Sequence, residues 1–269
     1  GAAGLTRRRL LGGALTAALG VPLLAGCGGV KGRRPEDLDP RVPALLAEAI
    51  SVDLHTHAAG AGHARIPRFD LADHMRRGRL SAVCLCHSAD GPVIRRLPGG
   101  GRIRQYREPA PGELHAFTEQ RLAFMDAMVS QHGMTRVLGP ADLEQAKAAG
   151  RPALIGTIEG CQFLDGRLDR VKEVYDRGVR HLQLVHYMPS ELGDQQTEDP
   201  KWGGLSPLGT DVVRECNRLG IVVDVAHGTQ ALLQQAAAES TAPFVLSHTS
   251  LARGAPAQYS RLISAEHAG

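Results

Sequence analysis

Two histidines stand two residues apart in the stretch SVDLHTHAAG, which begins at Ser51. Side chains alternate between the two faces of a β-strand, so His55 and His57 point the same way if the segment is extended. Two neutral imidazoles that converge on one point make half of a typical metal site. A buried structural histidine followed by a polar loop residue gives the same pattern, so the pair alone does not separate the two interpretations.

Further polar residues stand at the ends of other apolar segments. Apolar and β-branched composition predicts strands at Ala49–His55, Leu80–Cys86, Ala153–Glu159, His181–His186, Ile221–His227 and Phe244–His248. Five of these end at a candidate ligand or acid-base group, namely His55 with His57, Glu159, His186, His227 and His248. Because the carboxyl ends of barrel strands meet at one mouth, we expect these side chains to lie together.

The fold class follows from what separates the strands. Helical patterns are predicted at Glu113–Gln131, Ala141–Ala149, Leu168–Arg177, Thr210–Leu219 and Gln230–Glu239. Alternating strands and helices predict an α/β protein with a parallel sheet. A doubly wound sheet would spread the strand ends along an edge at about 5 Å per strand, so we predict a TIM-like (β/α)8 barrel. The segment from Ser88 to Pro111 is predicted to be a long irregular insertion.

The predicted cluster suits metal-assisted hydrolysis. Four histidines and a glutamate favour zinc, and the carboxylate can bridge two ions. Two ions about 3.5–4 Å apart hold a hydroxide and polarise a carbonyl oxygen, which serves amide or ester hydrolysis. His186 is treated separately, because it can donate a hydrogen bond to an oxyanion instead of binding metal. A histidine buried in the core is the alternative for this residue.

Composition narrows the class of protein. The chain has 269 residues, of which 43% are hydrophobic and 22% are charged, as in a globular protein of one or two domains. The formal net charge is +3, partly from arginines near the N-terminus, and only 4% of the residues are aromatic. These values give no indication of a nucleic-acid-binding surface.

The first 27 residues indicate export and lipid attachment. An arginine cluster at residues 7–9 precedes an apolar stretch that is short for a membrane span and is interrupted by glycine and proline. The cluster resembles a twin-arginine signal, and LAGC, which ends at Cys27, resembles a bacterial lipobox. Residues 28–40 are predicted to be a flexible tether, which would leave the protein lipid-anchored in the bacterial cell envelope. An ordinary membrane anchor or a buried helix is the alternative.

Four cysteines remain after Cys27. Cys84 and Cys86 share one face of a predicted strand and make poor disulfide partners, so we predict buried free thiols. A zinc site built from Cys84, Cys86 and His87 is the alternative, although the usual two-residue spacer between the cysteines is missing.

Five stretches together resemble a known family. DLHTH, IEG, GVRHLQLVHY, GLSPLGTDVVRECNRLGIVVDVAH and FVLSHTS are similar, in this order, to motifs of the membrane (renal) dipeptidase family of zinc metallopeptidases, within the amidohydrolase-like superfamily. The similarity runs from about Ile50 to Ser264. It implies a barrel domain over residues 41–269, two zinc ions, hydrolysis of dipeptides by a metal-bridged hydroxide, and a homodimer.

The resemblance also implies roles for single residues. It carries metal-ligand roles onto His55, Glu159 as the bridge, His227 and His248. His186 matches a histidine that contacts substrate and stabilises the transition state. Arg261 lies near the position of an arginine that holds the substrate carboxylate.

Two departures from the family pattern have consequences. His57 stands where many members have aspartate; it can still bind zinc, but it removes a negative charge and can change metal preference. The family also has strands after the region of Arg261, and the last carries an aspartate that binds metal and handles the proton. Six strand units are predicted here against eight in a full barrel, so we expect a truncated barrel, with Asp194 as the first candidate for proton acceptor.

Three functions stay open at this point. The first is a zinc-dependent dipeptidase. The second is a non-catalytic metal-binding lipoprotein or remnant, and the third is an amidohydrolase of other specificity, such as a deacylase or lactonase.

The lipobox makes a direct prediction. Cys27→Ser removes the thiol that would carry lipid, so the variant should leave the membrane fraction or stay unprocessed. Fractionation and incorporation of labelled lipid measure this. If variant and parent fractionate alike and neither takes up lipid, Cys27 is not a lipidation site.

Overall fold

The computed structural model describes residues 39–58, 70–98, 101–254 and 257–268. The predicted export signal, Cys27 and residues 28–38 of the tether lie outside the described residues. The elements described below belong to one unit, Arg41–Gly269.

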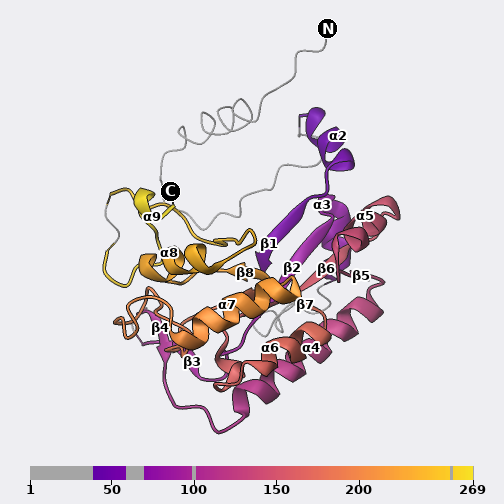
Figure 1. The fold of residues 1–269 in the computed structure, drawn as a ribbon. Helices are drawn as coiled ribbons and strands as arrows, with labels where there is room; N and C mark the ends of the chain where they lie inside the picture. Colours follow the sequence, from indigo (N-terminus) through magenta and orange to yellow (C-terminus); the bar gives the residue numbers. More distant parts are fainter. Residues whose placement is uncertain (1–38, 59–69, 99–100, 255–256, 269) are drawn as a thin grey trace. The chain divides into compact units, whose positions relative to one another are not determined.

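The centre of the unit is a parallel sheet (Figure 1). Its strands follow the order β1 (Val52–Thr56), β2 (Ala82–Ser88), β6 (Ala153–Glu159), β7 (Val179–Gln183) and β8 (Val222–Asp224). The short β5 (Thr135–Arg136) pairs with the start of β6, and Val245 makes a single parallel bridge to Asp224. The six predicted strands therefore occupy neighbouring positions in chain order, although the sixth is reduced to that bridge.

The sheet curls strongly. His55 at the end of β1 stacks on His248, which follows the bridge at Val245, with ring centroids 3.7 Å apart. In a flat sheet the first and sixth strand positions would lie roughly 24 Å apart, at about 4.8 Å per strand. The contact between its two ends is therefore that of a partial barrel and not of an open doubly wound sheet.

The described chain has eight α-helices, several of which pack against strands of the sheet. They are α2 (Arg41–Glu48), α3 (Leu71–Gly78), α4 (Glu113–Gln131), α5 (Pro140–Ala148), α6 (Asp169–Asp176), α7 (Pro207–Leu219), α8 (Gln230–Glu239) and α9 (Ala265–Ala268). α4 contacts β2 and β6, and α7 packs between α6 and α8 (Figure 1). Apolar side chains such as Leu122 on α4 and Val212 and Val213 on α7 are fully buried. Among the described residues, none of the helices combines the length and the apolar character that a bilayer crossing demands.

One prediction needed correction, and the helices α2, α3 and α9 were not predicted. The insertion from Ser88 to Pro111 is not irregular throughout, because β3 (Ile94–Arg96) and β4 (Ile103–Gln105) pair as an antiparallel hairpin. Helix α3 was not predicted, since it is short and highly charged. Its N-cap, Asp70, accepts a hydrogen bond from the Asp73 N–H at 2.9 Å and was the available sequence signal.

The start of α7 has no room for a side chain at one position. A Cβ at Gly209 would lie 1.9 Å from the carbonyl oxygen of Leu192. That oxygen is fixed, because it accepts a hydrogen bond from the Ser206 N–H at 2.9 Å. The close approach joins α7 to the loop that follows β7.

We predict that Gly209→Ala lowers the free energy of unfolding by about 3 kcal/mol, at the upper end of overpacking costs. Gly78→Ala is the matched control, since a Cβ there meets nothing within 4 Å and alanine favours the helix. Urea unfolding measures both. Equal stability of the two variants would contradict the close approach.

Candidate metal centre

The carboxylate of Glu159 lies at the centre of the predicted site. Glu159 ends β6 and is only 1% exposed. Its Oε2 lies 3.2 Å from the Nε2 of His57. Its Oε1 lies 3.2–3.9 Å from the Nε2 atoms of four further histidines, His186, His227, His248 and His55. The structure thus brings together every histidine and the glutamate that the sequence placed at strand ends.

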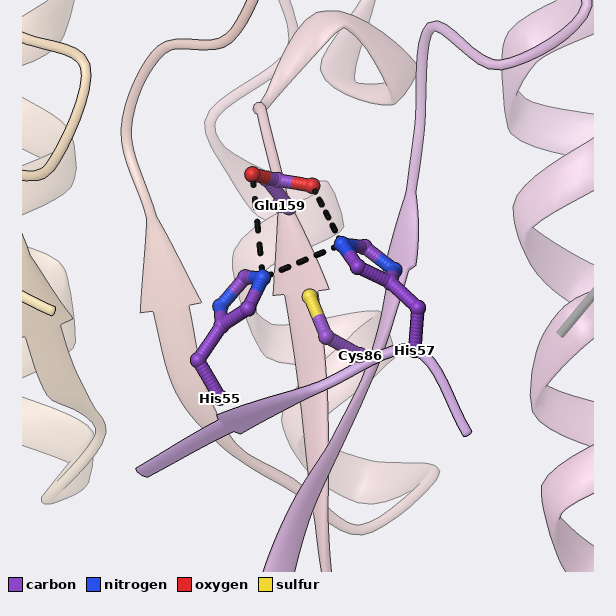
Figure 2. Close-up of side chains that lie close together, drawn as sticks. All are labelled: His55, His57, Cys86 and Glu159. Atoms are coloured by element: carbon purple, nitrogen blue, oxygen red, sulfur yellow. Dashed lines mark hydrogen bonds and ion pairs between the residues drawn. The ribbon is translucent and has the colours of Figure 1, made fainter. Parts of the chain in front are cut away.

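Four of these five imidazoles form two pairs. The Nε2 atoms of His55 and His57 are 3.0 Å apart (Figure 2), and those of His227 and His248 are 3.1 Å apart. Two nitrogen ligands of one tetrahedral zinc lie about 3.3 Å apart when each Zn–N bond is about 2.0–2.1 Å. Each pair therefore has the spacing of two ligands on a common ion, with the two Glu159 oxygens between the pairs.

Burial sets the charges of these ligands. Desolvation by burial lowers the pKa of His55 to about 4 and holds the pKa of His227 well below its ordinary value. Burial alone would raise the pKa of Glu159, but the neighbouring imidazoles, His186 first, hold it well below its usual range. Neutral imidazoles and an ionised carboxylate are the states in which these groups bind metal.

His248 is oriented by a chain of hydrogen bonds from the base of the site. The Ser247 hydroxyl donates to Oδ2 of the fully buried Asp224 and lies 2.8 Å from Nδ1 of His248. The hydroxyl has a single proton, so it accepts from the Nδ1–H of His248. The Nε2 lone pair of neutral His248 is then left facing Glu159 and His227.

His186 is held by a second carboxylate. Its Nδ1 lies 2.6 Å from Oδ1 of the fully buried Asp90, whose Oδ2 accepts the backbone N–H groups of Tyr187 and Met188. Burial would lower the pKa of His186, but Asp90 and Glu159 together raise it. When His186 is protonated, its Nδ1–H donates to Asp90 and its Nε2–H is a second donor at the edge of the ligand cluster, whereas the neutral ring keeps its proton on Nδ1.

Arg261 reaches the same cluster from the C-terminal part of the described chain. Its Nη2 lies 3.3 Å from Nε2 of His248, and its Nη1 donates to Gln196 at 2.8 Å. Burial lowers its pKa. No carboxylate of the described residues lies within ion-pair distance of Arg261, so this guanidinium is available to an anionic group of a ligand.

Of the alternative zinc site built from Cys84, Cys86 and His87, only Cys86 lies near other potential metal ligands in the described chain. All four described cysteines are free and buried. Cys86 lies with His55, His57 and Glu159 in a group of potential metal ligands, whereas Cys84 and His87 belong to no such group in the described chain. His87 instead faces Phe117 of α4, and both of its ring nitrogens are buried without a hydrogen-bond partner among the described residues.

Asp194 is not placed to accept a proton. It is 3% exposed, and its carboxylate accepts the backbone N–H groups of Lys201, Trp202 and Gly204 at 2.6–3.2 Å. These bonds close the loop before α7, so the residue is structural.

Sequence reasoning missed the residues that orient the histidines. Asp90 lies far from His186 along the chain. Ser88, whose hydroxyl donates to Glu159 Oε2 at 2.7 Å, is also far from that carboxylate. Ser247 stood beside His248 in the quoted FVLSHTS stretch. Asp224 stood inside the quoted VVDVAH segment, which was the available signal for it.

Comparison with known proteins finds a matching family model. The model of the family described as membrane dipeptidase (peptidase family M19) matches residues 40–258. An uncharacterised dipeptidase of Schizosaccharomyces pombe is 39% identical over 94 residues, which are 35% of this chain and 23% of the relative. Dipeptidase 3 of Mus musculus is 34% identical over 101 residues, covering 36% and 20% of the two chains. The chain spans about a quarter of the length of the first relatives it matches.

Solved structures show the same fold. The probable dipeptidase PvdM from Pseudomonas aeruginosa has a TM-score of 0.65 at 23% identity, covering 84% of this chain and 58% of that chain. A metallopeptidase from Rhodobacter sphaeroides, liganded with a phosphinate mimic of the dipeptide L-Ala-D-Ala, has a TM-score of 0.61 at 17% identity. It covers 81% of this chain and 69% of that chain. Both likenesses support the TIM-like α/β architecture.

The Asp90 geometry predicts a tautomer switch. In Asp90→Asn the amide oxygen must face the N–H groups of Tyr187 and Met188, so the NH₂ group faces Nδ1 of His186. The ring must then accept at Nδ1 and carry its proton on Nε2 when neutral. Long-range ¹H–¹⁵N NMR of histidine-labelled protein should show this change for His186.

Asp142→Asn is the control, because that carboxylate caps α5 away from the histidines. An unchanged His186 spectrum in Asp90→Asn would contradict the role of Asp90. Loss of the buried pair should also lower the free energy of unfolding by about 3 kcal/mol.

Proposed function

Because the chain belongs to the membrane dipeptidase family, peptidase family M19, we propose that its metal centre serves the hydrolysis of dipeptides. The observation that carries the proposal is the position of Glu159 between two imidazole pairs, each with the spacing of ligands on one ion. The named relatives are dipeptidases and support the same reaction class.

We propose that the centre holds two zinc ions. His55 and His57 would hold one and His227 and His248 the other, with Glu159 as the bridge. The donor set fits this metal, since imidazole nitrogen and carboxylate oxygen are ordinary zinc ligands. When bound, such ions lower the pKa of water to near 7 and polarise a carbonyl oxygen.

The protein's own groups would bind and orient the substrate. The Arg261 guanidinium, without a carboxylate partner among the described residues, would hold the terminal carboxylate of the dipeptide. Protonated His186, held at Nδ1 by Asp90, would donate its Nε2–H to the carbonyl oxygen as negative charge develops there. Both groups are held by hydrogen bonds within the protein, to Asp90 for His186 and to Gln196 for Arg261, so we propose that they need little reorganisation in the transition state.

The stereochemistry of the substrate is a finer proposal. The Rhodobacter sphaeroides relative binds a mimic of L-Ala-D-Ala, and we propose that this protein also accepts dipeptides with a C-terminal D-residue. A panel of L,L and L,D dipeptides, with an N-acyl amino acid and a lactone beside them, separates this activity from a deacylase or lactonase.

We also propose that the protein is exported and anchored through lipid on Cys27, and that it forms a homodimer. The anchoring proposal is supported by the arginine cluster and the LAGC stretch. The dimer is supported only by the resemblance to the family.

The bridging position of Glu159 predicts an asymmetry among ligand variants. Glu159→Ala removes a ligand from both ions, so its zinc content should fall from about two per chain toward zero, whereas His248→Ala should keep about one. Zinc-dependent dipeptide hydrolysis should be lost in Glu159→Ala by a factor of at least about 10³.

Glu144→Ala, a change at an exposed glutamate of α5, is the control and should keep both metal and activity. Metal analysis and a ninhydrin assay measure these quantities. Equal zinc content in Glu159→Ala and His248→Ala would exclude the bridge, and absence of metal from reconstituted parent protein would exclude the centre.

A further inference from the structure

Cys86 lies beneath the pair formed by His55 and His57, which is called the first pair below. In the register of β2 and β6, Ser88 stands opposite Glu159 and Cys86 stands opposite Thr157. Residues two apart share one face of a strand, so the thiol lies on the face that carries Glu159, one step toward the start of the strands. Figure 2 shows its sulfur pointing toward the space between the imidazoles and the carboxylate.

The distances make the thiol part of the ligand cluster. One ligand atom each from Cys86, His55, His57 and Glu159 lies within 4.8 Å of all the others. The edge between sulfur and nitrogen in a tetrahedral zinc site is about 3.5 Å, given Zn–S and Zn–N bonds of about 2.3 and 2.0–2.1 Å. A shift of about 1 Å would therefore bring the sulfur into bonding range.

The thiol has no competing strong partner. Cys86 is 3% exposed, and its thiol makes a weak hydrogen bond to the carbonyl oxygen of its neighbour His87 at 3.8 Å. The other described cysteines belong to no group of potential metal ligands in the described chain. Cys161 donates to the carbonyl oxygen of Gln183 at 3.4 Å, within the core.

A metal ion held by the first pair would have little negative charge among its ligands. His55 and His57 are neutral donors in a metal site, and the single carboxylate, Glu159, faces the second pair as well. Two imidazoles and one carboxylate oxygen supply three ligands, whereas a closed zinc site has four. A thiolate would supply both the fourth ligand and a negative charge.

The groups assigned to substrate lie with the other pair. Arg261 contacts His248, and His186 contacts the Glu159 oxygen that faces His227 and His248. The Cys86 sulfur lies one step toward the start of the strands, on the core side of the histidines. Zinc can expand to five-coordinate, so a fourth protein ligand on the ion of the first pair would still leave a position for water.

We propose that the Cys86 thiolate is the fourth protein ligand of the ion held by His55, His57 and Glu159. This proposal rests on the metal centre of the proposed function. As the metal–sulfur bond forms, the S–H bond breaks and the proton leaves to solvent. The resulting site of two nitrogens, one oxygen and one sulfur favours Zn²⁺, Co²⁺ and Cd²⁺ over Mn²⁺ and Mg²⁺.

Cobalt substitution tests the proposal on the whole chain. Co²⁺ titration should produce visible d–d bands together with a near-ultraviolet band from charge transfer between sulfur and cobalt. Cys86→Ser should keep d–d bands but lose the charge-transfer band. Cys84→Ser is the matched control, since Cys84 is a buried cysteine on the same face of the same strand, and it should keep both.

Each outcome decides a separate question. Three results would overturn the Cys86 proposal and leave the metal centre standing. The first is a wild-type protein that shows d–d bands without the charge-transfer band. The others are a charge-transfer band that survives Cys86→Ser and one that disappears in Cys84→Ser. Absence of any cobalt signal overturns both proposals. Circular dichroism checks that the variants fold.

Cadmium-113 NMR of the parent protein gives a test without any variant. One downfield signal of thiolate type is expected. Signals confined to the range of nitrogen and oxygen ligands would contradict the proposal.

Metal preference gives a second readout. Cys86→Ser replaces sulfur with a hard oxygen, so its affinity for Cd²⁺ relative to Mn²⁺ should fall by about tenfold or more. An unchanged ratio contradicts ligation by the thiol.

Discussion

A single buried carboxylate governs the arrangement of this protein. Glu159 is nearly inaccessible to solvent, and an ionised carboxylate in such a place is stable only when it is surrounded by hydrogen-bond donors or cations. The His186 ring and the Ser88 hydroxyl donate to it, and the other four imidazoles surround it at the distances of metal ligands. Because these groups come from the ends of different strands, the sheet must curl until the ends meet.

The same curl explains the second layer of polar residues. Asp90 and Asp224 are fully buried, yet the oxygens of both carboxylates accept hydrogen bonds. Asp90 is bonded to His186 and to backbone N–H groups. Asp224 is bonded to His181, Ser247 and backbone N–H groups. Their geometry determines which nitrogen of His186 and His248 faces the centre. The core beneath the site is thus built to fix tautomers as well as positions.

The site has two chemically different sides. On one side, His186 and Arg261 contact the groups around His227 and His248. On the other side, His55 and His57 lie over a buried thiol and the face of β2. This asymmetry places the groups assigned to substrate on one side of Glu159 and the buried thiol on the other.

The sequence by itself determined the strand order, the bounds of α4 and α8, and the residues that converge. Apolar periodicity records which segments are buried, and the polar residues at strand ends record where parallel strands terminate. Neither pattern records the partners of those residues. Asp90 lies 96 positions before His186, inside a segment predicted to be irregular, and Asp194 looked available until its bonds to three backbone N–H groups were seen. Only the tertiary structure decided which carboxylates are occupied and which thiol lies near the ligands, because hydrogen bonding and burial depend on contacts between segments distant in the chain.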